Sequence, residues 1–390
     1  MYYYHIFALT LIDTPLRYNL PEQIIMQTVV AVFVFCIVLF LYLHIYFHIR
    51  TSDDLEVYEI DQPSKDKLEE ICDLRQPVVF EYDDATNSGT SGSFRNDVAF
   101  DVIKKNYGAF DVKVKNMKDV SADSEPYMPI TLNATHEIMK SDKASQFISE
   151  KNVEFLEETG VIKHFRYNDD FLRPPLVSNC DYDYTFASEG AETALQYNVN
   201  YRNYFMPVCG RARVILIPPK SSKYLYARSD YETFEFVSPV SPWNVQHTYK
   251  ADYDKIKTLE VQLTPGKILF IPAYWWYSIK YYDEATICTF KYRTYMNTVA
   301  ILPQLFLYFL QRQNVKRTTV KQMDSVDRNA TIASINANAN ANANATININ
   351  NANSTAVDNY IVGTNANETD HATISALPDT IISNTDASEP

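Results

Sequence analysis

Glycine is scarce in this chain, and its scarcity excludes several common enzyme classes. Only 8 of the 390 residues are glycine. Neither a GxxxxGK[ST] loop nor a GxGxxG turn occurs, so the sequence lacks the backbone cradles that bind the phosphates of nucleotides. Tyrosine and phenylalanine are abundant instead, at 29 and 21 residues. Many aromatic residues with few glycines favour a packed, aromatic-lined β fold.

Positive charge and paired cysteines are also in short supply. The chain has 35 Lys and Arg against 48 Asp and Glu, a formal net charge of −13. Binding of nucleic acid requires clustered Lys and Arg, so nucleic acid is not an expected partner. No CxxC pair, and hence no typical zinc site, occurs among the five cysteines, which are Cys36, Cys72, Cys180, Cys209 and Cys288. We expect free thiols, with one or two disulfides as the alternative in an oxidising compartment.

One long apolar run predicts a membrane anchor. Ile24 to Leu43 contains 20 residues without a charge, and the apolar run continues to Phe47. A helix of that length rises about 30 Å, the thickness of a hydrocarbon core. A signal peptide and a buried core helix are the alternatives, but aromatic and basic residues follow the run, where a cleavage site would need small ones. We predict a single-pass membrane protein with its anchor in the bilayer at 24–47, after an N-terminal segment at 1–23.

Glycosylation sequons favour one orientation of this anchor. Arg17 and Arg50 flank the run on either side, so the positive-inside count is nearly tied. The part of the chain after the anchor contains five sequons, at Asn133, Asn329, Asn344, Asn353 and Asn367. If the chain enters the secretory route, these sequons favour a luminal or external C-terminal part.

Residues 55–313 are predicted to form one mainly β domain with flanking helices. Pro63–Asp73, with Ser64 as N-cap, and Val98–Tyr107 are typical of helices, while Pro77–Tyr82 and Phe110–Val114 are typical of strands. Short β-branched and aromatic runs follow Pro174, at Leu195–Tyr204, Arg213–Ile217, Lys257–Leu263, Ile268–Ile271, Tyr274–Tyr281 and Ala285–Tyr292. Many short strands of this kind predict a jelly roll, the double-stranded β-helix of the cupins. The apolar segment Thr298–Gln311 predicts one closing helix that packs on the domain or forms a homodimer.

The last 62 residues, 329–390, have the composition of a disordered tail. They contain no Lys or Arg, Tyr360 is their only aromatic residue, and Asn and Ala alternate from Asn336 to Asn344. So little apolar bulk cannot offset the entropy lost on ordering, so we predict disorder. A glycan-bearing stalk is the functional alternative.

Two segments carry a resemblance to a known family. The first is Tyr197–Phe205, followed by Gly210 and by Val214–Pro219, and the second is Leu263–Tyr277. Both resemble the cupin-like branch of the JmjC superfamily, which includes asparaginyl hydroxylases dependent on iron and 2-oxoglutarate. The Pro-Gly-x-x-x-Phe-Ile-Pro-x-x-Trp-Trp signature in the second segment is the more specific one. The N-terminal anchor and Tyr-rich domain also resemble membrane-anchored cupin-like proteins of large DNA viruses.

At the positions that the resemblance assigns to the metal and to 2-oxoglutarate, this chain has residue types that do not suit either ligand. Active members of the family carry His, Asp or Glu, and His at the positions of Tyr197, Val199 and Tyr277. A 2-His-1-carboxylate face holds Fe(II), whereas a neutral phenol is a poor ligand and a valine is none. The lysine and threonine that the family uses for 2-oxoglutarate correspond to Ala212 and Ala194. We therefore predict a degenerate metal site and no cofactor.

Other side chains could line a pocket or rebuild a site. Alternative metal ligands are His247, Glu189, Glu192, His136 and His164, although exposed turns and loops explain them more simply. Lys291 and Arg293 lie on a late strand, where related enzymes place a basic residue for the co-substrate. The predicted pocket lining is Asn203, Tyr274, Trp275, Trp276 and Lys291. Aromatic lining favours a flat or apolar ligand or a peptide, and filling of the core is the alternative.

Three functions are compatible with these features. The first is a membrane-anchored, non-catalytic cupin-like protein that binds or scaffolds an unknown protein or peptide. The second is an Fe(II)- and 2-oxoglutarate-dependent hydroxylase with atypical ligands. The third is a structural viral envelope protein in which the fold is a stable ectodomain without a ligand.

Overall fold

The computed structural model describes residues 22–82, 93–118, 127–231 and 233–313. The predictions for the N-terminal residues 1–21 and for the tail at 329–390 lie outside these residues. The same holds for four of the five sequons, Asn329, Asn344, Asn353 and Asn367.

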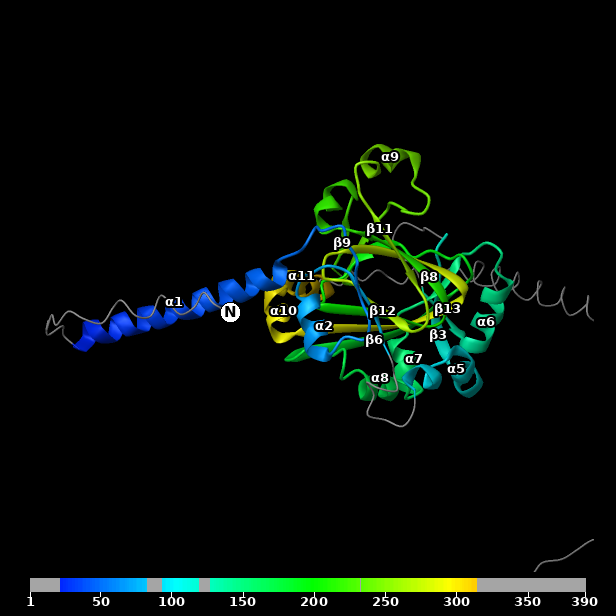
Figure 1. The fold of residues 1–390 in the computed structure, drawn as a ribbon, viewed down its shortest axis with the longest axis horizontal. Helices are drawn as coiled ribbons and strands as arrows, with labels where there is room; N and C mark the ends of the chain where they lie inside the picture. Colours follow the sequence, from blue (N-terminus) through cyan, green and yellow to red (C-terminus); the bar gives the residue numbers. More distant parts are fainter. Residues whose placement is uncertain (1–21, 83–92, 119–126, 232, 314–390) are drawn as a thin grey trace, which may run out of the picture. The chain divides into compact units, whose positions relative to one another are not determined.

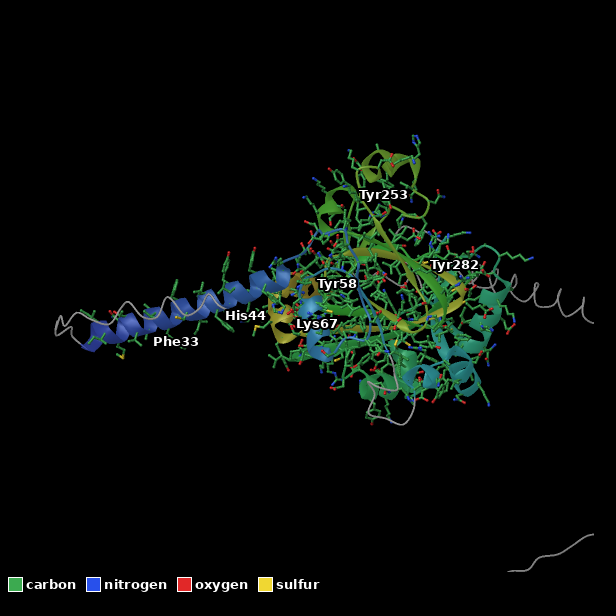
Figure 2. All side chains as sticks on the ribbon, viewed as in Figure 1. Phe33, His44, Tyr58, Lys67, Tyr253 and Tyr282 are labelled. Carbon is green, nitrogen blue, oxygen red and sulfur yellow. The ribbon has the colours of Figure 1, made fainter. Side chains whose placement is uncertain are left out.

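The predicted anchor is a single helix, α1 (Glu22–Ile49). Its segment Ile24–Ile49 has a mean hydropathy of 2.9 in its most apolar window, and 0% of that window is buried. A core helix of a soluble domain would be mostly buried, whereas Phe33 and its neighbours project freely from α1 (Figure 2). By length and composition, α1 can therefore cross a membrane.

Short helices and strands precede the main β region. They are β1 (Tyr58–Ile60), α2 (Lys65–Cys72), β2 (Val78–Glu81), α4 (Phe94–Asp97), α5 (Phe100–Tyr107), β3 (Asp111–Asn116), β4 (Met128–Thr131), α6 (Leu132–Ser141), β5 (Phe147–Ser149), α7 (Val153–Glu158) and α8 (Ile162–Asn168). The predicted cap of α2 is confirmed, because the Ser64 hydroxyl accepts a hydrogen bond from the Lys67 backbone N–H at 3.3 Å. The strand predicted at Pro77–Tyr82 is β2, and the one predicted at Phe110–Val114 is β3.

The rest of the domain is mostly β, as predicted. Its elements are β6 (Val177–Ala187), β7 (Leu195–Tyr197), β8 (Arg202–Ile217), the 3-10 helix η1 (Pro219–Tyr224), β9 (Arg228–Asp230), β10 (Glu235–Ser238), α9 (His247–Tyr253), β11 (Leu259–Leu263), β12 (Lys267–Phe270), β13 (Trp276–Thr294), α10 (Tyr295–Ala300) and α11 (Leu302–Gln313). The strands lie in the order β1-β2-β12-β8-β13-β6-β5-β3-β4, with β11 on β8, β7 on β13, and β10 between β7 and β9. This arrangement is a cupin-type jelly roll with helices on its outside (Figure 1).

Two long strands run through both halves of the jelly roll. The sequence predicted breaks within β8 and β13, but each strand is continuous and the two pair antiparallel along most of their length. Their irregularities are bulges, marked by register shifts between Tyr282 and Ile287. Positive φ values at Asp283 (56°) and Gly210 (67°) mark the same place, so the turn-like residues bend the strands without ending them.

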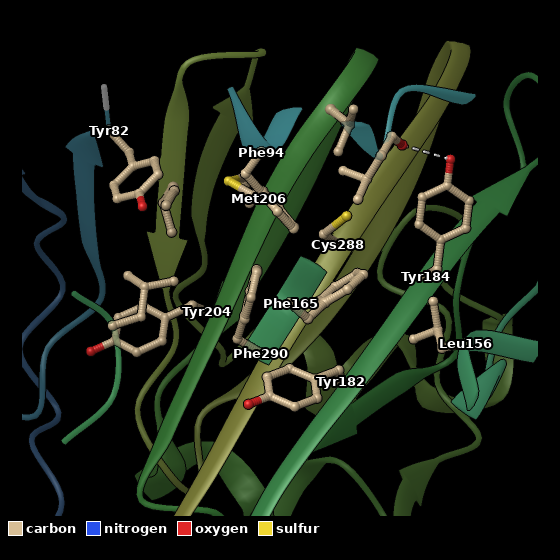
Figure 3. Close-up of a cluster of buried hydrophobic side chains, with 14 of the residues drawn as sticks. Tyr82, Phe94, Leu156, Phe165, Tyr182, Tyr184, Tyr204, Met206, Cys288 and Phe290 are labelled. Atoms are coloured by element: carbon tan, nitrogen blue, oxygen red, sulfur yellow. Dashed lines mark hydrogen bonds between the residues drawn. The ribbon is translucent and has the colours of Figure 1, made fainter. Parts of the chain in front are cut away.

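Alternate residues of these strands pack on opposite sides. Cys288, Phe290 and Tyr292 of β13 face a large cluster shared with α2, α4, α5, α7 and α8, here called the helix-side cluster. Figure 3 shows aromatic side chains from this cluster, with the Tyr184 hydroxyl donating to the Val98 carbonyl at 3.1 Å. Ile287 and the other half of β13 face a second cluster inside the jelly roll. This period of two places each side chain of β13 on a known face.

The C-terminal helix differs from the prediction. The single helix expected at Thr298–Gln311 is two helices, α10 and α11, which meet at Ile301. Pro303 lies in the first turn of α11, where its missing N–H costs nothing, whereas inside a continuous helix it would remove a hydrogen bond.

Candidate functional site

The interior of the jelly roll is filled by one cluster of buried side chains, here called the inner cluster. It consists of 18 residues contributed mainly by β8, β11, β12 and β13 and includes Phe205, Ala212, Val214, Leu216, Leu263, Leu269, Ile271, Trp275, Tyr277, Ile279, Tyr281 and Ile287. One of the three predicted ligand positions, Tyr277, belongs to it. The inner cluster is therefore the place where a metal site of this fold would be sought.

Tyr277 is held as a neutral phenol. Its side chain is only 3% exposed, and its ring lies 5.1 Å from the ring of Phe205. The side-chain amide of Asn198 donates a hydrogen bond to the Tyr277 hydroxyl oxygen, with Nδ2 and Oη 2.9 Å apart. Burial raises the pKa of Tyr277 above its ordinary value, so the phenolate that could bind a metal is disfavoured.

Tyr197 and Val199 face a different part of the core. In the pairing of β7 with β13, Tyr197 lies opposite Trp276 while Gln196 lies opposite Tyr277. Successive strand residues point to opposite faces, so Tyr197 and Tyr277 are on different sides. The ring of Tyr197 stacks on that of Phe236 at 4.9 Å.

Val199 belongs with Tyr197. It is buried in a third cluster with Phe236 and Ile301, and Tyr197 and Tyr274 pack against the same cluster. The resemblance implied that Tyr197, Val199 and Tyr277 converge, but the structure brings only Asn198, the residue between the first two, to Tyr277. Sequence reasoning missed Asn198, because nothing in the sequence shows how the chain turns between β7 and β8.

The two co-substrate positions contribute no polar side-chain atom. Ala212 is fully buried in the inner cluster, paired with Tyr281 on β13 and Leu263 on β11. Ala194 is half-buried and directly precedes β7. A methyl group at either position cannot bind the carboxylate of 2-oxoglutarate.

Lys291 is the one predicted pocket residue that presents a charge to the interior. It alternates with Phe290 and Tyr292 of the helix-side cluster, so its side chain points to the inner face. Burial opposes its charge, but nearby Tyr277, Asp183, Asp181 and Glu150 outweigh burial and raise the pKa of Lys291. Within the residues that the structure describes, the Lys291 ammonium makes no hydrogen bond and no ion pair within 4.0 Å, while its backbone pairs with Asp181 and Asn203.

Further polar side chains lie around Lys291. The Tyr127 hydroxyl donates to Glu150 at 2.8 Å, and the ammonium of Lys151 lies 5.0 Å from the centre of the Tyr127 ring. Asp183 accepts hydrogen bonds from the backbone N–H groups of Lys151 and Asn152, at 2.9 and 2.8 Å. Burial raises the pKa of the Asp183 carboxyl. Tyr127, Glu150, Asp183 and Lys291 thus form a group of neighbouring polar side chains.

The paired tryptophans fill the core, and neither lines either of two depressions on the surface of the described residues. Trp275 and Trp276 are both 0% exposed, and they belong to different clusters. The Trp275 indole donates to the Arg75 carbonyl at 3.2 Å, and the Trp276 indole donates to the Ser222 hydroxyl at 2.7 Å. Both indoles are therefore packed in the core, as in the alternative of core filling.

Asn203 and Tyr274 also have structural surroundings. The Asn203 amide donates to the carbonyls of Asn200 and Ile271, at 3.2 and 3.1 Å. Tyr274 has a φ of 67°, and its backbone N–H donates to the Asn198 carbonyl at 2.8 Å.

The larger of the two surface depressions has a volume of about 510 Å³. It is lined by residues of α8 and β6 and of the chain between them, among them Arg166, Arg173, Leu176 and Tyr182.

The alternative metal ligands are scattered. Glu192 pairs with Lys280 at 2.8 Å, and His164 lies 3.5 Å from Asp97. His136 packs on the ring of Phe100, and Glu189 and His247 are exposed. Among the described residues, no group of three or more His, Cys, Asp or Glu side chains is placed to hold a metal ion.

The described cysteines are all free thiols, as expected. The sequon residue Asn133 is exposed in the first turn of α6.

Comparison with known proteins agrees with the two motif segments. A sequence model of the cupin-like domain matches residues 62–295. HSPB1-associated protein 1 of Homo sapiens is 31% identical over 101 residues, which are 26% of this chain and 21% of that protein. JmjC domain-containing protein D of Dictyostelium discoideum is 29% identical over 92 residues, 24% of this chain and 20% of that protein. The matched region thus spans about a fifth of the length of these curated relatives.

Proposed function

Because this chain belongs to the cupin-like domain family, we propose that it is a member without a metal site that acts as a membrane-anchored binding or scaffold protein. The observation that carries the proposal is the separation of the former ligand positions. Tyr277 lies in the inner cluster, while Tyr197 and Val199 pack in another. Fe(II) in this family requires nitrogen and carboxylate donors that converge on one point. The side chains present do not fit that ion, and we derive no step of chemistry through it.

The anchor in this proposal is α1. Its uncharged run is as long as the hydrocarbon core is thick, and its side chains are exposed to the surroundings. Extraction of membranes with alkaline carbonate tests the anchor. The full chain should stay in the membrane pellet, and its release into the soluble fraction would contradict a spanning helix.

The proposed partner is a protein or peptide. The name of HSPB1-associated protein 1 records an association of that relative with another protein, which makes protein binding a reasonable expectation here. Next to the buried Tyr277, the half-buried side chains of Asn198 and Lys291 offer an amide and an ammonium, and the ammonium carries no ion pair among the described residues. These groups suit hydrogen bonds to a polar segment of a partner better than coordination of a metal.

Metal analysis together with a turnover assay tests the loss of catalysis. The full chain, purified in detergent and incubated with Fe(II), should retain far less than one equivalent of iron. It should also convert no 2-oxoglutarate to succinate above a blank without protein. Near-stoichiometric iron with oxygen-dependent succinate formation would overturn the proposal.

The hydroxylase with atypical ligands is the second candidate, and Lys291 favours it. An ammonium that faces the interior and has no ion pair within the described part of the chain is what a co-substrate carboxylate would need. In that case Lys291→Met should abolish turnover, and iron should be lost on His247→Ala or Glu192→Gln. Iron that survives both substitutions would show that neither His247 nor Glu192 is its ligand.

A further inference from the structure

Helix α11 presents an apolar side to its surroundings. Its exposed large side chains, here called the apolar face, are Leu302 (52% exposed), Phe306 (58%), Leu307 (44%), Phe309 (56%) and Leu310 (43%). The spacing of three and four residues puts them on one broad side of the helix. The opposite side holds the helix to the domain, through Leu305 in the third cluster and the ring of Tyr308, which lies 5.5 Å from that of Phe234.

An apolar face of this kind requires a cover. Soluble monomers rarely expose contiguous large apolar side chains, and such patches mark sites of contact with a protein or a membrane. Burial of apolar side chains is favourable in proportion to the area removed from water, so five half-exposed ones provide a driving force for contact. No acidic or basic side chain of the described residues interrupts the face, since Leu302 to Gln311 contains none.

The position of α11 indicates what covers it. Helix α10, which directly precedes α11, packs against α1. The residues of α1 that lose exposure are His44, Ile45 and His48, immediately after the uncharged run Ile24–Leu43. Figure 1 shows α10 and α11 beside this end of α1, and Figure 2 marks His44 there. If the run fills the hydrocarbon core, α10 and α11 lie at the depth of the lipid headgroups.

We propose that the apolar face of α11 docks into the interface of the same bilayer that α1 crosses. The inference rests on the proposed anchoring and adds a second contact, in which an amphipathic helix lies along the membrane surface. Lys316, Arg317 and Lys321 follow α11 with no acidic residue before Asp324, which suits the anionic cytoplasmic leaflet and favours the opposite orientation to the one that the sequons favour. The domain is then held at two points, which fixes its tilt relative to the membrane.

A second copy of the chain is the main competitor for this face. A stable protein interface usually uses about 20–30 residues on each side. The apolar face offers five side chains on one 12-residue helix, which is small for an isolated dimer contact. A bilayer covers such a face without any matching partner surface.

Quenching of tryptophan by brominated lipid tests the docking. The full chain carrying Phe309→Trp is reconstituted into vesicles of phosphatidylserine and acyl-brominated phosphatidylcholine. Its control carries His247→Trp, at an exposed site in α9. After subtraction of the unaltered chain, we expect strong loss of fluorescence for Phe309→Trp and little for His247→Trp. The loss of fluorescence of the Phe309→Trp chain should disappear when Phe306→Ser and Leu310→Ser are added to it.

Three results would overturn the inference, and each is distinguishable. Equal quenching of the Phe309→Trp and His247→Trp chains, with both retained in the pellet after carbonate extraction, would refute the docking and leave the anchor intact. Unquenched fluorescence together with disulfide-linked dimers of a Leu310→Cys chain would assign the face to a second copy. Release of the chain by carbonate would remove the anchor and the docking with it.

Discussion

Asn198 and Tyr277 are joined by a hydrogen bond of 2.9 Å from the side-chain amide to the phenol oxygen. The contact links the chain between β7 and β8 to the start of β13, the two places where the family's motif segments lie. The Tyr277 hydroxyl oxygen is therefore already bound by a side chain of the same protein. The interior at this point thus holds a neutral hydrogen bond, where an active relative would place a metal-binding histidine.

We expect this hydrogen bond to contribute measurably to stability. Asn198→Ala should lower the free energy of unfolding by about 1–2 kcal/mol, because it leaves a buried hydroxyl without its partner. Tyr277→Phe should cost a similar amount, and the double variant should cost less than the sum of the two. Chemical denaturation of the four chains measures this coupling, for which about 0.5–1.5 kcal/mol is expected.

Tyr167→Phe is the matched control for this cycle. The Tyr167 side chain is 74% exposed, so removal of its hydroxyl should change stability by no more than about 0.5 kcal/mol. Additive costs of Asn198→Ala and Tyr277→Phe would show that the two groups do not interact in solution.

Much of the fold could be predicted because local signals agree with it. The uncharged run predicted α1, and Ser64 predicted the start of α2. The β-branched and aromatic runs predicted the strands. The breaks expected within β8 and β13 were wrong, because Gly210 and Asp283 take positive φ inside a bulge and the strands continue past them. Pro303 did carry a usable signal, since proline is unfavourable inside the helix that was expected to contain it.

The facing of the site residues could not be predicted from the sequence. Tyr197 ends β7 and Arg202 begins β8, and the chain between them is irregular. In a regular strand the side chain of Asn198 would point to one face, and those of Tyr197 and Val199 to the other. Which of these two faces meets Tyr277 depends on the pairing of β7 with β13. That pairing is a long-range relationship, and the motif alone does not specify it.

Trp275 should behave as a core residue. It is 0% exposed, and its indole N–H is bound to the Arg75 carbonyl. Trp275→Ala should lower the free energy of unfolding by about 3–5 kcal/mol, because it leaves a cavity and an unpaired carbonyl. Trp243→Ala, at a half-buried indole bound to Ser278, should cost clearly less. Similar small losses in both variants would mean that Trp275 lines open space.

Gly210 should be intolerant of a side chain. Its φ is 67°, and a Cβ there would lie 2.5 Å from the Cα of Ala285. Gly210→Ala combines left-handed strain of about 1–2 kcal/mol with a backbone clash. Gly160 is the matched control, because its φ is 74° and nothing lies within 4 Å of an added Cβ. Thermal unfolding should show a larger loss for Gly210→Ala than for Gly160→Ala, and equal losses would exclude the clash.

Cys72 should make the domain less stable at alkaline pH. Burial raises the pKa of its thiol from 9.0 to about 11, and the sulfur lies 3.7 Å from the Tyr204 hydroxyl oxygen. Between these two values the unfolded thiol ionises while the folded one keeps its proton. The unfolded state then binds fewer protons, so the free energy of unfolding falls as the pH rises, by up to about 2–3 kcal/mol for this group.

Cys72→Ala isolates this effect, because alanine has no proton to lose at this position. The small cavity that the substitution leaves costs stability equally at every pH, so only the slope of stability against pH is compared. Below pH 9.0 the two chains should have parallel profiles, since the thiol is protonated in both states. Between pH 9.0 and about 11 the unaltered chain should lose stability more steeply. Parallel profiles throughout would show that the Cys72 thiol reaches solvent and ionises in the folded protein.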